Sequence, residues 1–284
     1  MMQTNAKQVF YFHADAVSIG GFLEEPFRFV PTPSSAALSS AGGLATTATK
    51  EFNFEDGIKA TSTYTFVTGR PVQDGGPWTQ RVVSVIEGLD LFGRFTADRL
   101  VAQVFIEQPA GGGLRKISFA GSSFTNLRVD GKPLVLHSES ALLPTQDRDV
   151  DAYNQSATCT PDLAWPTLSG VAQRQGATLL ANKETPEWAR SRFGWITAKQ
   201  PDGKTGFEGY TLCSLVNQVD GLAAGQSFGH CVDIPDFGTI FLAEIVVFPY
   251  SVQLAMLRAE LCGKPKGHVS CCIVIPNGVS DPPN

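Results

Sequence analysis

The stretch from Ser84 to Ile106, SVIEGLDLFGRFTADRLVAQVFI, constrains the fold most because it joins two strand patterns through one glycine, Gly93. Before Gly93, apolar residues alternate with polar ones, which predicts a strand with one buried face. The apolar positions of this strand are Val83, Val85, Leu89 and Leu91. After Gly93, Leu100, Ala102, Val104 and Ile106 alternate with Val101, Gln103 and Phe105. The second strand is therefore apolar on both faces, and we expect it inside the structure.

The succession of strand and glycine corner returns elsewhere in the chain, in SSFTNLRVDG (Ser122 to Gly131) and in HADAVSIGG (His13 to Gly21). We interpret these echoes as a repeated supersecondary unit. The predicted fold is all-β, built from strand and glycine-corner units as a β-solenoid or a β-sandwich. Repetition of the corners favours the solenoid. The long reach of the two strands from Val82 to Ile106 suits a sandwich almost as well.

The pattern predicts a β-repeat region at 1–143, a loop-rich insertion at 144–202 and a C-terminal β region at 203–279 that completes the same domain. Residues 280–284 are expected to form a disordered tail. The insertion shows one helix signal, with Thr185 as N-cap, Pro186 at the first helical position and Gly194 as the stop. Two segments stay ambiguous. Residues 34–49 read as a flexible loop or a thin edge strand, and residues 251–261 as a helix or a strand.

The amino-acid composition limits the classes of molecule that the protein is expected to bind. Only 17% of the 284 residues are charged, and the chain has 28 glycines, which is typical of a protein of strands and turns. The net charge of −5 gives no electrostatic basis for binding nucleic acid. The sequence contains no apolar run of about eighteen residues, so we expect no membrane span. The first residues lack the apolar core of a signal peptide, which indicates a cytoplasmic protein, export by an unconventional route, or a sequence given without its original leader.

Three motifs carry a resemblance to a known family: GLDLFG (Gly88 to Gly93), TADRL (Thr96 to Leu100) and IPDFGTI (Ile234 to Ile240). They resemble the recurring elements of choice-of-anchor type bacterial surface proteins and of related leaderless proteins. The resemblance covers roughly a third of the chain. It implies an all-β, non-catalytic and extracellular protein, and it brings no catalytic residues with it.

Two signals point to catalysis. The segment Gly225 to Gly229 matches the G-x-S-x-G turn that exposes a nucleophilic serine, and Ser227, Asp233 and His268 occur in the order Ser, Asp, His. The required strand-to-helix context is missing, so a glycine-rich turn is the favoured interpretation. Glu244 lies within the apolar run GTIFLAEIVVF, where burial raises a carboxyl pKa. The favoured alternative places Glu244 on the solvent face.

Metal sites are the next candidates. Cys262, His268 and Cys271 offer zinc ligands, but their spacing has no C-x-x-C element. We favour buried free thiols, with a disulfide between two of Cys159, Cys213, Cys231 and Cys262 as the alternative. In this interpretation the adjacent Cys271 and Cys272 point to opposite faces of a strand.

An acidic segment gives the one calcium candidate. Asp147, Asp149 and Asp151 resemble the start of a calcium loop, but Ala152 and Thr158 stand where an EF-hand needs Gly and Glu. A solvated acidic loop is favoured, and we expect no cofactor, with calcium as the alternative.

The leading functional hypothesis is a non-catalytic structural or surface-interaction protein that self-associates or adheres to another protein or a glycan. It rests on the repeated pattern and on the lack of a coherent catalytic set. The alternative is a hydrolase-like enzyme or a small-ligand-binding protein, with its site in the C-terminal half.

Overall fold

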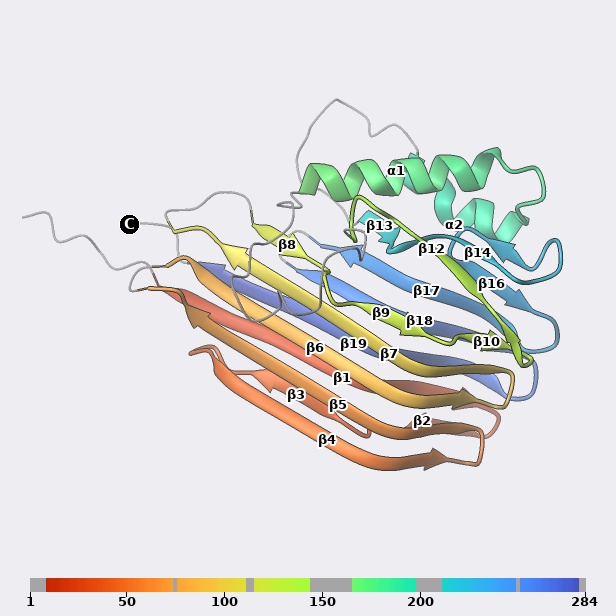
Figure 1. Ribbon diagram of the computed structural model, residues 1–284, viewed down its shortest axis with the longest axis horizontal. Helices are drawn as coiled ribbons and strands as arrows, with labels where there is room; N and C mark the ends of the chain where they lie inside the picture. Colours follow the sequence, from red (N-terminus) through yellow and green to blue (C-terminus); the bar gives the residue numbers. More distant parts are fainter. Residues whose placement is uncertain are drawn as a thin grey trace, which may run out of the picture.

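Two antiparallel β-sheets packed face to face form the body of the protein (Figure 1). The computed structural model describes residues 9–73, 76–110, 115–143, 165–197, 211–248 and 251–280. Sheet A contains, in spatial order, β15 (Ser227–Phe228), β16 (Cys231–Ile234), β17 (Gly238–Val247), β18 (Val252–Cys262), β19 (Lys266–Ser280), β1 (Phe10–Glu24) and β2 (Phe27–Val30). In the same sheet β13 (Thr211–Ser214) pairs with β17, and β3 (Ser35–Leu38) pairs with β1.

Sheet B is a meander that contains the stretch Ser84 to Ile106. Its order is β11 (Lys132–Pro133), β10 (Arg128–Val129), β7 (Phe95–Gln108), β6 (Trp78–Leu91), β5 (Ile58–Pro71) and β4 (Gly43–Phe54), with β8 (Lys116–Ser118) and β9 (Ser123–Thr125) on β7. A small third sheet pairs β12 (Val135–Ser138) with β14 (Val216–Asp220). Neighbours in sequence are mostly neighbours in the sheets, and this topology does not confirm the expected solenoid or repeat.

The main core lies between the two sheets, and β6 and β7 are central to it. Leu91 and Phe95, on either side of the turn at Gly93, are fully buried. The backbone N–H of Gly93 donates to Asp90 Oδ1 at 2.6 Å and closes this turn. Across the interface, Ser84 Oγ donates to the carbonyl of Val17 at 3.0 Å. Both faces of β7 are largely buried, as the sequence predicts.

The sequence predicts that Val83, Val85, Leu89 and Leu91 share one buried face of β6. This prediction is wrong for the first half of the strand. Val82 and Ile86 face the main core, whereas Val83 and Val85 lie on the outer face of sheet B. The cause is Gly88, whose φ of +60° is left-handed and reverses the alternation, so that Leu89 and Leu91 point inward again. A side chain at Gly88 would meet Thr61 at 2.7 Å, which leaves room for glycine alone.

The same reversal occurs in sheet A and corrects a second expectation. Cys271 and Cys272 do not point to opposite faces, because both are buried in the main core. Cys272 has a φ of +51°, and this left-handed residue turns two successive side chains inward. Ala243 in β17, with a φ of +47°, has the same effect and places Glu244 on the outer face.

The insertion contains two helices where the sequence predicts one. They are α1 (Trp165–Ala181) and α2 (Glu187–Thr197). α1 buries Leu168, Val171 and Ala172 in the main core, which outweighs the weak helix propensity of its two glycines. α2 does not stop at Gly194, because a glycine within a helix costs only about 1 kcal/mol and the burial of Phe193 offsets it.

The two ambiguous segments are strands. Residues 35–38 and 43–54 form β3 and β4, and residues 252–262 form β18 in the middle of sheet A. Within the described residues, no helix is long and apolar enough to span a membrane.

Candidate functional site

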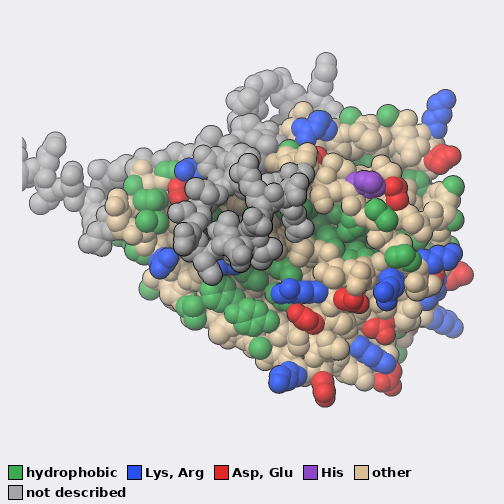
Figure 2. Space-filling view, in the orientation of Figure 1, with side chains coloured by type: hydrophobic (Ala, Val, Ile, Leu, Met, Phe, Trp, Pro, Cys, Tyr) green, Lys and Arg blue, Asp and Glu red, His purple; other side chains and the backbone are tan. Residues whose placement is uncertain are grey.

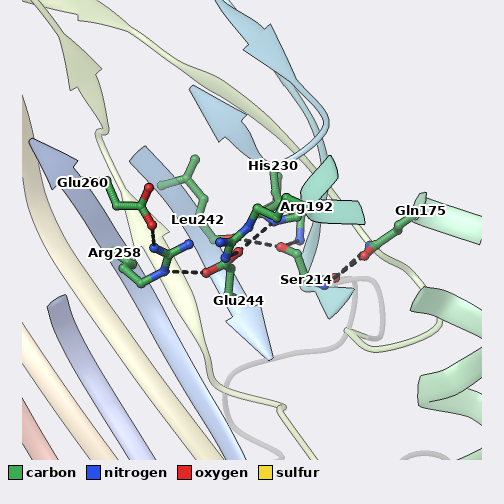
Figure 3. Close-up of polar contacts among 9 residues, drawn as sticks. Gln175, Arg192, Ser214, His230, Leu242, Glu244, Arg258 and Glu260 are labelled. Atoms are coloured by element: carbon green, nitrogen blue, oxygen red, sulfur yellow. Dashed lines mark hydrogen bonds and ion pairs between the residues drawn. The ribbon is translucent and has the colours of Figure 1, made fainter. Parts of the chain in front are cut away.

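A buried polar cluster lies on the outer face of sheet A, under α2, and is centred on Glu244 (Figure 3). Its side chains come from β17, β18, α2 and the turn before β16. The expectation that Glu244 faces solvent is wrong, since its side chain is only 3% exposed. The left-handed Ala243 is the local cause, because it turns Glu244 toward the helix instead of the main core.

Two arginines and a histidine surround the carboxylate of Glu244. Arg192 Nη2 donates to Oε1 at 2.8 Å, and Arg258 Nε donates to Oε2 at 2.8 Å. His230 Nε2 lies 3.4 Å from Oε1 and is itself buried. Arg258 also pairs through Nη1 with Glu260, whose side chain is about half exposed. Each carboxylate oxygen of Glu244 therefore has a charged donor of its own.

Phe241 forms the floor of the cluster. The guanidinium carbon of Arg192 lies 4.4 Å from the ring centroid of Phe241, and that of Arg258 lies 3.9 Å from it. Trp188 and Phe193 of α2 belong to the same aromatic group and pack near Phe228 and His230. The cation–π contacts and this apolar cluster hold α2 against the sheet.

The charges around Glu244 keep it ionised. Burial pushes the pKa of Glu244 up, but the hydrogen bond with His230 and the positive charges of Arg258 and Arg192 outweigh burial. The net result is a pKa well below the ordinary value of 4.5. Glu244 is thus an anion at neutral pH and a structural partner for two cations, and it is a poor general acid or base there.

The cluster continues across the sheet to β19. Ser270 lies directly opposite Arg258, and His268 lies opposite Glu260. Ser270 Oγ is 3.4 Å from His268 Nε2. Burial and the nearby charge of Arg258 lower the pKa of His268, which favours its neutral form. A serine, a neutral histidine and two guanidinium groups therefore share one face of sheet A.

The structure does not bring Ser227, Asp233 and His268 together. Asp233 pairs with Thr239 of β17, Thr239 with Glu260 of β18, and Glu260 with His268 of β19. Two whole strands thus separate Asp233 from His268, which corresponds to about 14 Å at the usual strand spacing. Ser227 lies beyond β16 in β15, farther still from His268.

The zinc candidates are also apart. Cys271 is buried in the main core, whereas the side chain of His268 lies on the opposite face of β19, stacked on Phe22. Over the described ranges, no group of three or more His, Cys, Asp or Glu side chains is placed to hold a metal ion. The calcium candidates Asp147, Asp149 and Asp151 lie outside the described residues.

The described cysteines are free thiols, and four of them are buried as expected: Cys213, Cys231, Cys271 and Cys272. Cys262 is exposed near the end of β18, so the expectation of a buried thiol is wrong there. Cys159 lies outside the described residues. Burial raises the pKa of Cys231 and Cys271 well above the ordinary thiol value and that of Cys272 to about 12. Thiols in this state are poor nucleophiles and metal ligands at neutral pH.

The sequence did not point to Arg192 or Arg258, and it offered His230 only as a possible zinc ligand and not as a partner of Glu244. One usable signal was present, because Arg258 interrupts an apolar run as Glu244 does, and the two runs are neighbours in the chain. Opposite charges inside two adjacent apolar strands favour a buried ion pair. Arg192 and His230 carry no such signal, since only the tertiary fold brings them to β17.

The free edge of sheet B is the second candidate site. β4 ends the sheet, and within the described part of the chain its hydrogen-bonded neighbour is β5 (Figure 1). Thr47 and Thr49 point inward and donate through their hydroxyls to carbonyls of Ser35 and Pro33. Leu44, in contrast, is 65% exposed. The edge is 12 residues long, and among the described residues no second strand pairs with its outer side.

Figure 2 looks onto the outer face of sheet B, where hydrophobic side chains gather over β5 and β6. Phe66 of β5, Val83 and Val85 of β6 and Val101 of β7 form a small apolar cluster there. Tyr64 of β5, which pairs in register with Val85, is 40% exposed. Charged side chains collect at the other end of this face, near the hairpin turns. The part of the face next to the first half of β4 is therefore poor in charge.

Comparison with known proteins gives one match. A family model described as Domain of unknown function (DUF8256) matches residues 10–248. No curated protein and no solved structure matches the chain. The matched range includes Arg192, His230 and Glu244 but ends before β18 and β19, which lie between β17 and β1 in sheet A. Because the match spans most of its length, the chain belongs to the family described as DUF8256.

Proposed function

We propose that the protein is a non-catalytic interaction protein that self-associates by pairing β4 of one copy with β4 of a second copy. The observation that carries this proposal is a 12-residue edge strand whose first half, Gly43 to Thr49, contains no charged residue. The resemblance to bacterial surface proteins favours the same interpretation. The hydrolase-like alternative has less support, because two strands separate Asp233 from His268.

Exposed edge strands offer unpaired N–H and C=O groups to another strand, and most proteins protect such edges with charges, proline or a bulge. In β4 such protecting features occur only at Lys50 and Glu51. Lys50 carries a charge, and Glu51, with a φ of +55°, interrupts the regular strand. The unprotected part is therefore Gly43 to Thr49, which is rich in threonine and small residues.

A second copy is the natural occupant because the segment is complementary to itself. In an antiparallel pair with its twofold axis at Thr46, Leu44 of one copy faces Ala48 of the other, and Gly43 faces Thr49. No charge meets another charge in this register. The exposed Leu44 side chain gains apolar contact, and sheet B continues from one copy into the next.

Sedimentation velocity over a range of protein concentrations tests the proposal. We expect the wild type to form a dimer or larger assembly as concentration rises. Leu44→Lys with Ala48→Lys in one chain places like charges opposite each other in the pair, and we expect this variant to remain monomeric. Both positions lie on an edge strand, so the monomer should fold normally.

The matched control is Val135→Lys, an exposed apolar position on β12 outside sheets A and B. We expect this variant to associate as the wild type does. A wild type that stays monomeric at high concentration, or a doubly substituted variant that associates equally well, would contradict the proposal.

A further inference from the structure

The two guanidinium groups of the Glu244 cluster have donors that the cluster does not use. Among the described residues, neither Arg192 Nε nor Arg258 Nη2 has a hydrogen-bond acceptor, although both atoms are buried. Buried donors are paired in the large majority of cases, and an exception in a folded protein calls for a ligand or another physical cause. These two exceptions lie in one place.

Their proximity follows from two shared partners. Both arginines bind the carboxylate of Glu244, one to each oxygen. Both also contact the ring of Phe241, so their guanidinium carbons are at most about 8 Å apart. Figure 3 shows the two groups approaching Glu244 from two sides. Both unused N–H groups thus lie beside the same carboxylate and ring.

The formal charges of the two arginines, Glu244 and Glu260 cancel, but one of the two carboxylates lies largely in solvent. Glu244 is the buried carboxylate that the two guanidinium groups share. Glu260 also pairs with Arg258, but its side chain is 52% exposed, so solvent weakens its effect on the buried charges. A further negative group would balance the second guanidinium and accept the unused hydrogen bonds.

We propose that Arg192 Nε and Arg258 Nη2 bind an oxyanion, the phosphate or carboxylate group of a ligand, beside Phe241. Guanidinium donors suit oxyanions because several N–H groups in a fixed fork match two or more acceptor oxygens. Ser270 lies opposite Arg258 on the same face of sheet A and supplies a neutral hydroxyl next to the site. The site is on sheet A and is independent of self-association through β4 on sheet B.

Isothermal titration calorimetry tests this site with inorganic phosphate and with acetate, each compared with chloride at equal ionic strength. We expect one of the two oxyanions to bind with a stoichiometry of one, while chloride gives no saturable signal. Binding of phosphate alone identifies a tetrahedral anion as the ligand group, and binding of acetate alone identifies a carboxylate.

Two variants of α2 separate the site from general effects. Arg192→Lys keeps a positive charge near Glu244 but loses Nε, and we expect the Kd to rise at least about tenfold. Arg190→Lys makes the same exchange at a residue that donates to the backbone carbonyls of Thr185 and Leu180. We expect the control to keep the Kd within about twofold of the wild type.

Glu260→Gln provides the third test, because it removes a competing carboxylate from Arg258 without touching the buried pair. We expect tighter binding of the oxyanion, which a purely structural cluster would not produce. This variant also serves if Arg192→Lys fails to fold, as judged by circular dichroism. The proposal is overturned if neither oxyanion binds beyond chloride, or if a folded Arg192→Lys and Glu260→Gln both keep the wild-type Kd.

Discussion

Arg258 and Glu244 form a buried ion pair between neighbouring strands, with Nε and Oε2 2.8 Å apart, although Glu244 pairs in register with Ala255. The diagonal contact exists because Ala243 and its left-handed backbone turn Glu244 toward the outer face. Arg192 binds the other oxygen from α2. One carboxylate therefore ties the helix to two strands of sheet A.

Removing this carboxylate should be costly. Glu244→Gln leaves two guanidinium groups partly buried without their counter-charge, and we expect the free energy of unfolding to fall by about 3–5 kcal/mol. Glu260→Gln is the matched control, because it removes the exposed carboxylate of the same arginine, and we expect a loss of about 1 kcal/mol or less. Urea denaturation of both variants measures the difference. Equal losses would contradict the structural role of Glu244.

The stability that Glu244 supplies should depend on pH in one direction. Its pKa in the folded protein lies below the ordinary value of 4.5, so the unfolded chain takes up the proton first. The contribution is complete above pH 4.5 and is lost as the pH falls below that value. We expect the difference in unfolding free energy between wild type and Glu244→Gln to shrink below pH 4.5. A constant difference from neutral to acidic pH would contradict this assignment.

The glycine that reverses β6 should be intolerant of a side chain. Gly88 and Gly93 both have left-handed φ values, +60° and +66°, but a side chain meets Thr61 at Gly88 and open space at Gly93. We expect Gly93→Ala to cost about 1–2 kcal/mol from backbone strain alone. Gly88→Ala should cost more, because steric overlap adds to the same strain. Thermal unfolding of the two variants measures the excess, and equal costs would contradict the close approach of Thr61.

The central position of β6 makes a further prediction. Leu91 is fully buried in the main core, so Leu91→Ala should destabilise the protein by about 2–5 kcal/mol. Leu44→Ala, at an exposed position in β4, should stay within about 0.5 kcal/mol of the wild type. Chemical denaturation compares the two, and a silent Leu91→Ala would show that the core is assigned wrongly.

Local patterns predict the strands better than their faces. The turn at Gly93 and the doubly apolar β7 follow from the alternation and from the glycine, and both are confirmed. The reversals at Ala243 and Cys272 are not readable, because neither residue type prefers left-handed backbone and the surrounding sheet imposes it. Those two reversals decide where Glu244 and Cys271 point.

The candidate site, too, is only partly predictable from the sequence. Glu244 stands out in the sequence, but its burial depends on α2, whose packing brings Arg192 onto Phe241 from a distant part of the chain. Alternation within one strand carries no information about a helix that covers it. The sequence also does not decide between a loop and an edge strand for the first half of β4, because its small residues suit both.

A charge exchange in β4 tests the proposed self-association most directly. In the register centred on Thr46, Leu44→Lys with Ala48→Glu in one chain places opposite charges across the pair twice, whereas Leu44→Lys with Ala48→Lys places like charges there. Sedimentation velocity should show that the oppositely charged variant associates and that the like-charged variant stays monomeric. Identical behaviour of the two variants would contradict pairing of β4 with its own copy.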